Sequence, residues 1–257
     1  MHESLKHLKI EQTDGVARIT FARPKHNVLD IEMIKEINDL LDRLAADEDL
    51  KCLVLLGEGP SWCAGVEVAD HKPEMADEMI AVFNGIFERI HKLEVPVVAG
   101  VHGACLGGGM EVAIACDIIV AAQKAVFGQP EIKLGFLPPY AAVRLPQLVG
   151  PARTIEVCTT GKRYSAEEAR QMGMIAYVTD DDNLPQVLDK LVAEIQACSP
   201  LIIRLNKRAV KQHLGMDFQS ALNGVSDLFL NVLMKTEDTL EGIRSFEEKR
   251  RPQWKNR

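Results

Sequence analysis

Residues 100–131 constrain the fold of this chain more than any other stretch. They read GVHGACLGGGMEVAIACDIIVAAQKAVFGQPE, in which a glycine triplet at 107–109 directly precedes an apolar run at 110–116. Glycine has no Cβ, so it adopts positive φ readily and lets a ligand approach the backbone amides. The apolar run predicts a buried helix whose first N–H groups lack intrahelical partners and lie at its positive end. The sequence thus predicts a place where a developing negative charge is stabilised.

Two glutamates accompany this triplet. Glu111 comes three residues after Gly108, about one helical turn on and on roughly the same face, and Glu131 follows one strand later. Two carboxyl groups beside an anion-stabilising helix end are typical of proton-transfer chemistry. Each feature alone also fits a structural role. A glycine triplet is often a turn, Glu111 favours the helix dipole, and Glu131 fits an exposed loop.

A second candidate donor lies upstream of the triplet. Residues 52–56 form a short apolar run that predicts a strand, and Gly65 lies in the loop after it. Loops that follow parallel strands commonly bind ligands, and Gly65 permits a backbone course that exposes the next amide. The N–H of Val66 is therefore the second predicted anion donor.

His102 and Cys105 flank the glycines without forming a metal or nucleophile set, and we interpret both as packing residues.

Hydrophobic periodicity predicts a mixed α/β chain. Strands are predicted over residues 5–11, 16–22, 52–56, 97–101 and 117–122. Helices are predicted over residues 31–46, about 75–93, 110–116, about 166–172, and almost continuously from 184. Asp30 and Ser199 are predicted N-caps, and Ser165 and Glu168 are predicted to form a capping box. Pro138-Pro139 redirect the chain before a short helix. The order strand, strand, helix recurs loosely through residues 1–131, and the composition becomes all-helical near residue 200.

Composition excludes several classes of function. The formal charge of −7 and pI near 5.6 argue against a general nucleic-acid or acidic-membrane binder. The six cysteines include no C-x-x-C pair and the N-terminus lacks a secretory signal, so we expect reduced thiols and a cytoplasmic protein. Membrane-spanning runs are not expected. The common serine hydrolase, zinc protease and nucleotide-binding signatures are missing from the sequence.

Three spaced motifs together resemble the enoyl-CoA hydratase/isomerase, or crotonase, family. They are CAGVEV at 63–68, HGACLGGGMEVAIACDIIVA at 102–121 and FGQPEIKLG at 127–135, and the likeness extends over nearly the whole chain. The resemblance implies an α/β, crotonase-like spiral of β-β-α turns over residues 1–199 and a C-terminal helical trimerisation region over 200–257. It implies a homotrimer or dimer of trimers that binds an acyl-CoA substrate. Coenzyme A is then part of the substrate, and no metal, other cofactor, nucleic acid or membrane partner is expected.

The resemblance also implies roles for individual residues. Val66 and Gly108 match the two backbone donors of the oxyanion hole that binds the thioester carbonyl. Glu111 and Glu131 match the two catalytic glutamates of the hydratases, the first as base toward water and the second as proton donor. Their joint presence favours hydration, with hydration of a linear enoyl-CoA or double-bond isomerisation as the alternatives to a cyclic dienoyl-CoA substrate. A non-enzymatic acyl-CoA-binding scaffold and a moonlighting RNA-binding member are further alternatives, and the net charge disfavours the second.

One segment departs from ordinary hydratases. After Glu131 the usual glycines are replaced by a proline-rich segment with Pro139 and Tyr140, and Pro139 cannot donate an N–H. This segment and GVEVADH resemble the family members that hydrate cyclohexa-1,5-diene-1-carbonyl-CoA, so Pro139 and Tyr140 are predicted to shape the acyl pocket for a flat ring. The resemblance implies further substrate contacts in other segments, at Ala64, Lys25, Phe246 and Lys249. The last two lie in a basic C-terminal stretch whose alternative interpretation is a solvated charged tail.

Overall fold

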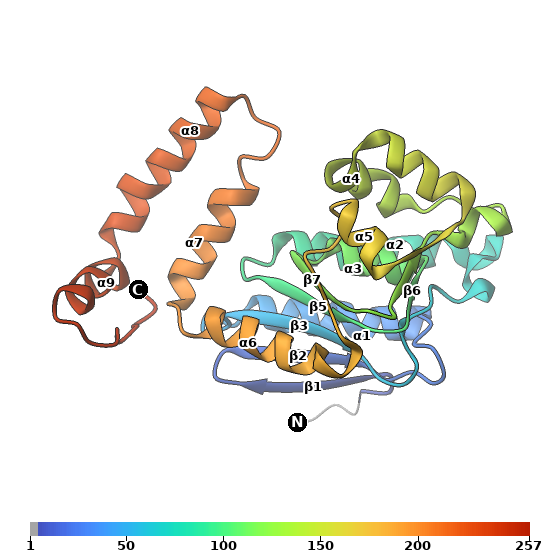
Figure 1. Cartoon of the computed structure of the whole chain (residues 1–257), viewed down its shortest axis with the longest axis horizontal. Coiled ribbons are helices and arrows are strands. Elements are labelled where there is room, and N and C mark those ends of the chain that lie inside the picture. Colours follow the sequence, from blue (N-terminus) through green and yellow to red (C-terminus); the bar gives the residue numbers. More distant parts are fainter. Residues whose placement is uncertain (1–4) are drawn as a thin grey trace.

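The computed structural model of the chain describes residues 5–257 and contains two sheets with helices packed around them (Figure 1). The larger sheet has the order β1-β2-β3-β5-β7-β10. Its strands are β1 (Leu8–Thr13), β2 (Val16–Phe21), β3 (Cys52–Gly57), β5 (Val97–Val101), β7 (Ile118–Ala122) and β10 (Tyr177–Thr179). The smaller sheet has the order β4-β6-β8-β9, formed by β4 (Ser61–Cys63), β6 (Ala104–Leu106), β8 (Val126–Gly128) and β9 (Arg163–Ser165).

The chain alternates between the two sheets and so forms a spiral. After the antiparallel β1–β2 hairpin, each turn places one strand in the large sheet, one in the small sheet and then a helix. In this way β3 and β4 lead into α2 (Pro73–Lys92), and β5 and β6 lead into α3 (Gly108–Ala115). Equivalent strands of successive turns pair in parallel in both sheets. The predicted β-β-α spiral is confirmed.

The two faces of the large sheet are buried differently. One face packs against α1 (Ile31–Ala45), α2 and α3, and this cluster forms the main core. The other face, with Val54, Val98 and Val120, is covered by α6 (Leu184–Gln196) through Leu184, Leu188 and Val192. Side chains alternate between the two faces along a strand, and in these parallel strands the residues on both faces are apolar. The sheet therefore holds the strand ends that carry the site in a rigid frame.

Several local predictions are confirmed. The side chain of Asp30 caps α1 by accepting from the Met33 N–H at 2.8 Å. Ser165 and Glu168 form a capping box at α5 (Ala166–Gln171). Ser199 caps α7 (Pro200–Lys211).

Other local predictions are wrong. The helix after Pro138 is not short: α4 (Pro139–Thr160) has 22 residues, with a kink at Gly150, where φ is 78°. Glu131 lies in a 3₁₀ turn, η2 (Pro130–Leu134), rather than in a loop. The helix after the glycines begins at Gly108, two residues earlier than predicted.

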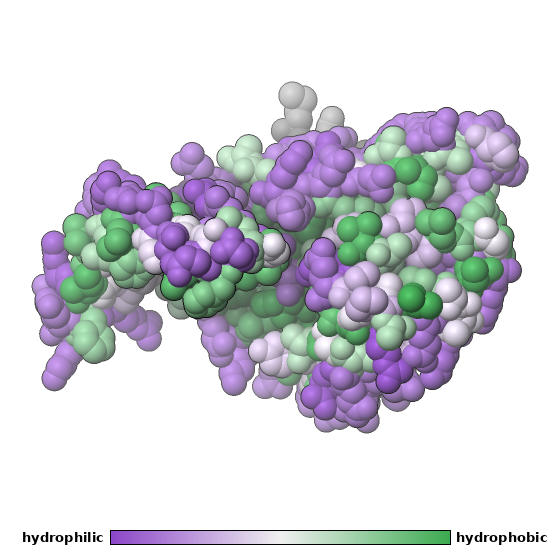
Figure 2. Space-filling view, turned by 90° about the horizontal axis from the view of Figure 1, so that it is seen from above, coloured by the Kyte–Doolittle hydropathy of each residue, from purple (hydrophilic) through white to green (hydrophobic). Residues whose placement is uncertain are grey.

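The last helices extend to one side of the sheets. After α7 come α8 (Phe218–Asp227), a π-helical turn (Leu228–Val232) and α9 (Glu237–Glu247), here called the C-terminal arm together with α7 (Figure 1). Apolar side chains lie on the surface of this arm (Figure 2). Large exposed ones include Phe218, Leu230 and Phe246. Within residues 5–257, no helix has both the length and the hydropathy that crossing a bilayer requires.

Candidate active site

The N-terminus of α3 supplies one unpaired amide. Gly107 is the N-cap with φ 55°, a conformation that favours glycine, and its own N–H bonds the Gly128 carbonyl at 2.9 Å. Gly108 begins the helix, and among the described residues its N–H has no hydrogen-bond acceptor. A Cβ at Gly108 would lie 2.4 Å from Cγ2 of Val66, so only glycine allows these two segments to approach so closely. The free amide lies at the positive end of α3.

The second unpaired amide belongs to Val66. Leu29 forms an isolated parallel bridge to it: the Leu29 N–H donates to the Gly65 carbonyl at 2.8 Å, and the Leu29 carbonyl accepts from the Glu67 N–H at 2.7 Å. In such a bridge the backbone groups of the middle residue point away from its partner strand. Within residues 5–257 the Val66 N–H accordingly donates to no acceptor. Two neighbouring segments thus present free donors side by side.

Both donors border a cavity of about 650 Å³. Its size suits a small organic ligand, and most of its lining is apolar, including Val68, Met79, Ile80, Phe83, Phe136 and Leu137. Val66, Gly108, Glu111 and Glu131 all line the same cavity. The residues predicted as anion donors and as acids are therefore brought together.

Glu111 is buried, with 2% of its surface exposed. Burial raises the pKa of Glu111 to about 7, the charge of nearby Glu131 adds to the shift, and hydrogen bonds from the backbone oppose it. One of these bonds comes from the Ala141 N–H in the first turn of α4, at 2.8 Å from Oε1. A carboxyl group with this pKa can take up or release a proton near neutral pH.

Glu131 is half-buried, and burial raises its pKa to about 7 as well. The fully buried Gln129 lies beside it. With its side-chain nitrogen toward Glu131, the amide donates to both carboxylate oxygens at 3.0 and 2.9 Å. Gln129 was not predicted from the sequence. The available signal was a polar residue at the end of an apolar strand, two positions before a candidate acid.

These raised pKa values predict a pH-dependent stability. Because the folded-state pKa of Glu111 lies above its ordinary value of 4.5, the folded protein binds more protons than the unfolded chain between pH 4.5 and about 7. The contribution of Glu111 to stability is full below pH 4.5 and is lost as pH rises through about 7. We expect Glu111→Gln, which keeps an acceptor for Ala141, to raise the melting temperature at pH 8 by about 4 °C.

Thermal melts at pH 5 and pH 8 measure this effect. The gain of Glu111→Gln over the wild type should be larger at pH 8, since the buried carboxylate is charged there. An equal gain at both pH values would show that burial does not raise the pKa of Glu111.

The proline-aromatic segment contributes in two ways. Pro139 is the first residue of α4 and lines the cavity. Tyr140 is stacked on Phe87 with ring centroids 3.8 Å apart, and Phe87 in turn contacts the cavity residue Phe83 edge to face at 4.8 Å. Tyr140 thus supports the cavity wall from behind. Although Pro139 has no N–H, the same first turn of α4 still supplies the Ala141 N–H to Glu111.

The remaining predicted substrate residues are distributed unevenly. Ala64 lines the cavity. Lys25 is exposed and does not belong to the lining of the cavity. Phe246, 85% exposed, and Lys249 lie at and just beyond the end of α9 on the C-terminal arm. A single chain therefore does not bring these last three residues to the cavity wall.

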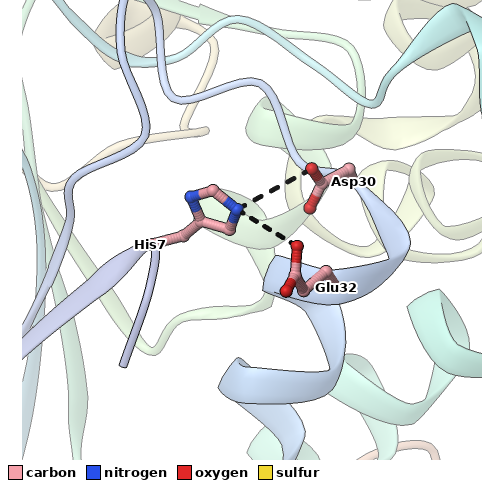
Figure 3. Close-up of side chains that lie close together, drawn as sticks. All are labelled: His7, Asp30 and Glu32. Atoms are coloured by element: carbon pink, nitrogen blue, oxygen red, sulfur yellow. Dashed lines mark ion pairs between the residues drawn. The ribbon is translucent and has the colours of Figure 1, made fainter. Parts of the chain in front are cut away.

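A separate cluster near the start of α1 has spacing that a metal ion could use (Figure 3). Nε2 of His7 lies 4.0 Å from Oδ2 of Asp30 and 3.6 Å from Oε2 of Glu32. The same two oxygens already pair with Nε of Arg23 at 3.0 Å and Nζ of Lys6 at 2.5 Å. A cation would have to displace these ion pairs, so we interpret the cluster as a salt-bridge network that joins the residues just before β1 to the start of α1.

Comparisons with known proteins agree with the geometry. The sequence profile of the enoyl-CoA hydratase/isomerase family matches residues 11–257. A cyclohexa-1,5-dienecarbonyl-CoA hydratase from Thauera aromatica is 32% identical over 100% of both chains. A short-chain-enoyl-CoA hydratase from Clostridium acetobutylicum is 32% identical over 98% of this chain and 99% of the relative. The solved structure of an enoyl-CoA hydratase from Bacillus anthracis superposes with a TM-score of 0.91 at 28% identity, covering 98% of this chain and 100% of the other.

Proposed function

The chain belongs to the enoyl-CoA hydratase/isomerase family, and we propose that it adds water to an α,β-unsaturated acyl-CoA thioester. One observation carries this proposal. Two unpaired backbone donors and two glutamates with pKa values near 7 line a single, mostly apolar cavity. The donors suit a carbonyl oxygen that gains negative charge, and the acids suit the transfer of protons to and from carbon and water.

The proposed reaction proceeds through an enolate. The thioester oxygen accepts hydrogen bonds from the Val66 and Gly108 N–H groups, which draw electron density from the double bond. Glu111 takes a proton from water as the water oxygen bonds to the β-carbon, and the displaced electron pair moves onto the thioester oxygen. When the enolate collapses, Glu131 delivers a proton to carbon. Each oxyanion donor is expected to contribute about 3 kcal/mol, as in related acyl chemistry.

For the acyl group we propose a cyclic conjugated diene. The cavity is lined by apolar and aromatic side chains, and Pro139, whose ring fixes its backbone φ, forms part of its wall. The similarity to the Thauera aromatica hydratase supports this choice, as does the stacking of Tyr140 and Phe87 behind Phe83. A stiff wall favours a flat, rigid ring because less conformational freedom is lost on binding. The proton would then be delivered at the far end of the dienolate.

A comparison of two substrates tests this choice. Cyclohexa-1,5-diene-1-carbonyl-CoA should be hydrated with a kcat/KM at least about tenfold higher than that of crotonyl-CoA, which corresponds to about 1.4 kcal/mol. Efficient hydration of crotonyl-CoA with no reaction of the ring diene would contradict the ring assignment. It would leave hydration of a linear enoyl-CoA as the activity.

We also propose that the C-terminal arm packs against further copies of this chain, as a trimer or a pair of trimers. Its exposed apolar side chains include Phe218, Leu230 and Phe246, at 79%, 62% and 85% exposure. Apolar surface of this kind is normally covered in an assembly. Phe246 and Lys249 would then approach the coenzyme A of a neighbouring copy, which accounts for their distance from the cavity of their own chain.

A further inference from the structure

We propose that Asn27 is a positioning residue of the oxyanion hole, because its side chain fixes the segment that carries the Val66 amide. The inference rests on the proposed function, since it assigns the Val66 N–H to the thioester oxygen. Asn27 belongs to residues 26–30, here called the clamp segment, which precedes α1. It does not line the cavity and would act only through the backbone.

Asn27 combines a left-handed backbone with a buried side chain that donates hydrogen bonds. Its backbone is left-handed, with φ 52°, a conformation that among side-chain-bearing residues Asn adopts more readily than most. Its side chain is buried, with 1% of the residue exposed, and Nδ2 donates to the carbonyls of Glu58 and Ser61 at 2.8 Å each and of Trp62 at 3.2 Å. One carboxamide thus ties the clamp segment to the turn after β3 and to β4.

The backbone on both sides of Asn27 then holds the donor loop. The His26 carbonyl accepts from the Ala64 N–H at 3.0 Å. Leu29 bonds Gly65 and Glu67, the residues before and after Val66, at 2.8 and 2.7 Å. Because Leu29 engages the backbone on both sides of Val66, the clamp segment decides where the Val66 N–H points.

Arg23 provides a second tie on the same loop. Its Nη1 donates to the Val28 carbonyl at 2.8 Å, and its Nη2 lies 3.3 Å from the Glu67 carboxylate. The guanidinium therefore links the clamp segment to the residue that follows Val66. At 23% side-chain exposure it is more accessible than Asn27, so its replacement disturbs the core less.

Loss of the Asn27 amide should loosen this arrangement. Three carbonyls, two of them from residues with at most 3% exposure, would lose their common donor, and the clamp segment would be free to shift. Catalysis is sensitive to such shifts, because a misplacement of about 1 Å can lower a rate about 100-fold. Substrate binding should suffer less, since most of the cavity wall belongs to other segments.

The test compares Asn27→Gly with the wild type. Glycine keeps the left-handed backbone and removes only the carboxamide. We expect kcat for water addition to fall about 10- to 100-fold while KM changes less than about threefold. The matched control is Asp14→Gly, which alters another left-handed residue, φ 49°, in the distant β1–β2 turn and should leave kcat unchanged.

A spectroscopic measurement separates positioning from general damage to the fold. An arylacryloyl-CoA probe absorbs at longer wavelength when hydrogen bonds polarise its carbonyl, and the wild type should produce this red shift on binding. In Asn27→Gly the shift of the bound probe should shrink. If that variant does not fold, Arg23→Gln, which removes the second tie near the surface, should give the smaller red shift.

The outcomes distinguish this inference from the proposed function. A full red shift in folded Asn27→Gly overturns the positioning role of Asn27. If the glycine variant does not fold, a full red shift in Arg23→Gln overturns the inference that side-chain ties on the clamp segment position the Val66 amide. Loss of activity only in proportion to the unfolded fraction does the same. A wild type that neither shifts the probe nor adds water to any enoyl-CoA overturns the proposed function, and the inference with it.

Discussion

Replacing Glu131 by Gln should lower kcat for water addition about 1,000-fold, and Glu111→Gln should have an effect of the same order. A carboxamide cannot transfer a proton at neutral pH, whereas both carboxyl groups have pKa values near 7 in this cavity. The fold should survive both changes. At position 111 the amide oxygen can still accept from the Ala141 N–H, and at position 131 it can still accept from Gln129.

Steady-state kinetics and binding of a non-reactive acyl-CoA measure these effects separately. The double variant should be little slower than either single one, because the two acids act as a unit. Glu167→Gln, a surface change in an Arg170 ion pair, is the matched control and should retain the wild-type rate. If both active-site variants kept wild-type rates, the two-glutamate mechanism would be wrong. If the wild type bound acyl-CoA without turnover, the chain would be an acyl-CoA-binding scaffold.

Replacing Gly108 by Ala should lower kcat/KM about 100- to 1,000-fold. The new Cβ would lie 2.4 Å from Cγ2 of Val66 and 3.0 Å from Cζ of Phe83, well inside normal contact distance. The Val66 side chain is β-branched and has few favourable rotamers, and Leu29 holds the backbone on both sides of Val66. Moving the side chain away from the new methyl group would therefore cost free energy. The methyl group must therefore push apart the two segments that carry the proposed oxyanion donors.

Gly242→Ala is a matched control for this change. A Cβ there would meet Trp254 at 3.7 and 3.8 Å, which is ordinary van der Waals contact, and position 242 lies in α9. This variant should keep the wild-type rate and gain slightly in helix stability. The red shift of the bound arylacryloyl-CoA probe should be lost in Gly108→Ala and kept in Gly242→Ala. A Gly108→Ala enzyme with full rate and full red shift would remove Gly108 from the oxyanion hole.

The fold could be predicted from the sequence where periodicity is long. The helix at Ile31–Ala45 and the large-sheet strands such as Cys52–Gly57 have clear apolar patterns, and their predicted positions differ from the observed ones by only a few residues. The three-residue strands of the small sheet were not predicted, because so short a segment has no alternation to detect and is defined by its neighbours. The length of α4 was missed because Pro146, Gly150 and Pro151 are helix-breaking residues in sequence terms.

In the candidate site, too, some residues could be predicted from the sequence and others could not. Gly107, Gly108 and Glu111 are close in sequence, so their arrangement followed from the geometry of one helix start. Gln129 and Asn27 were missed, since their importance comes from partners that the sequence does not reveal. The Gln129 side chain donates to the Glu131 carboxylate in the 3₁₀ turn that follows it. The Asn27 side chain donates to three backbone carbonyls more than 30 residues away. Backbone acceptors have no residue type and so leave no motif.

Incorporation of labelled water is the most direct test of the proposed hydration. The wild-type enzyme is incubated in H₂¹⁸O with the ring dienoyl-CoA and, in parallel, with crotonyl-CoA. The masses of the products are then measured by mass spectrometry. We expect a hydroxyacyl-CoA product heavier than its substrate by one molecule of labelled water. The wild type should form this product, and the double variant Glu111→Gln, Glu131→Gln should not. A product of unchanged mass would indicate double-bond isomerisation and would contradict hydration at this site.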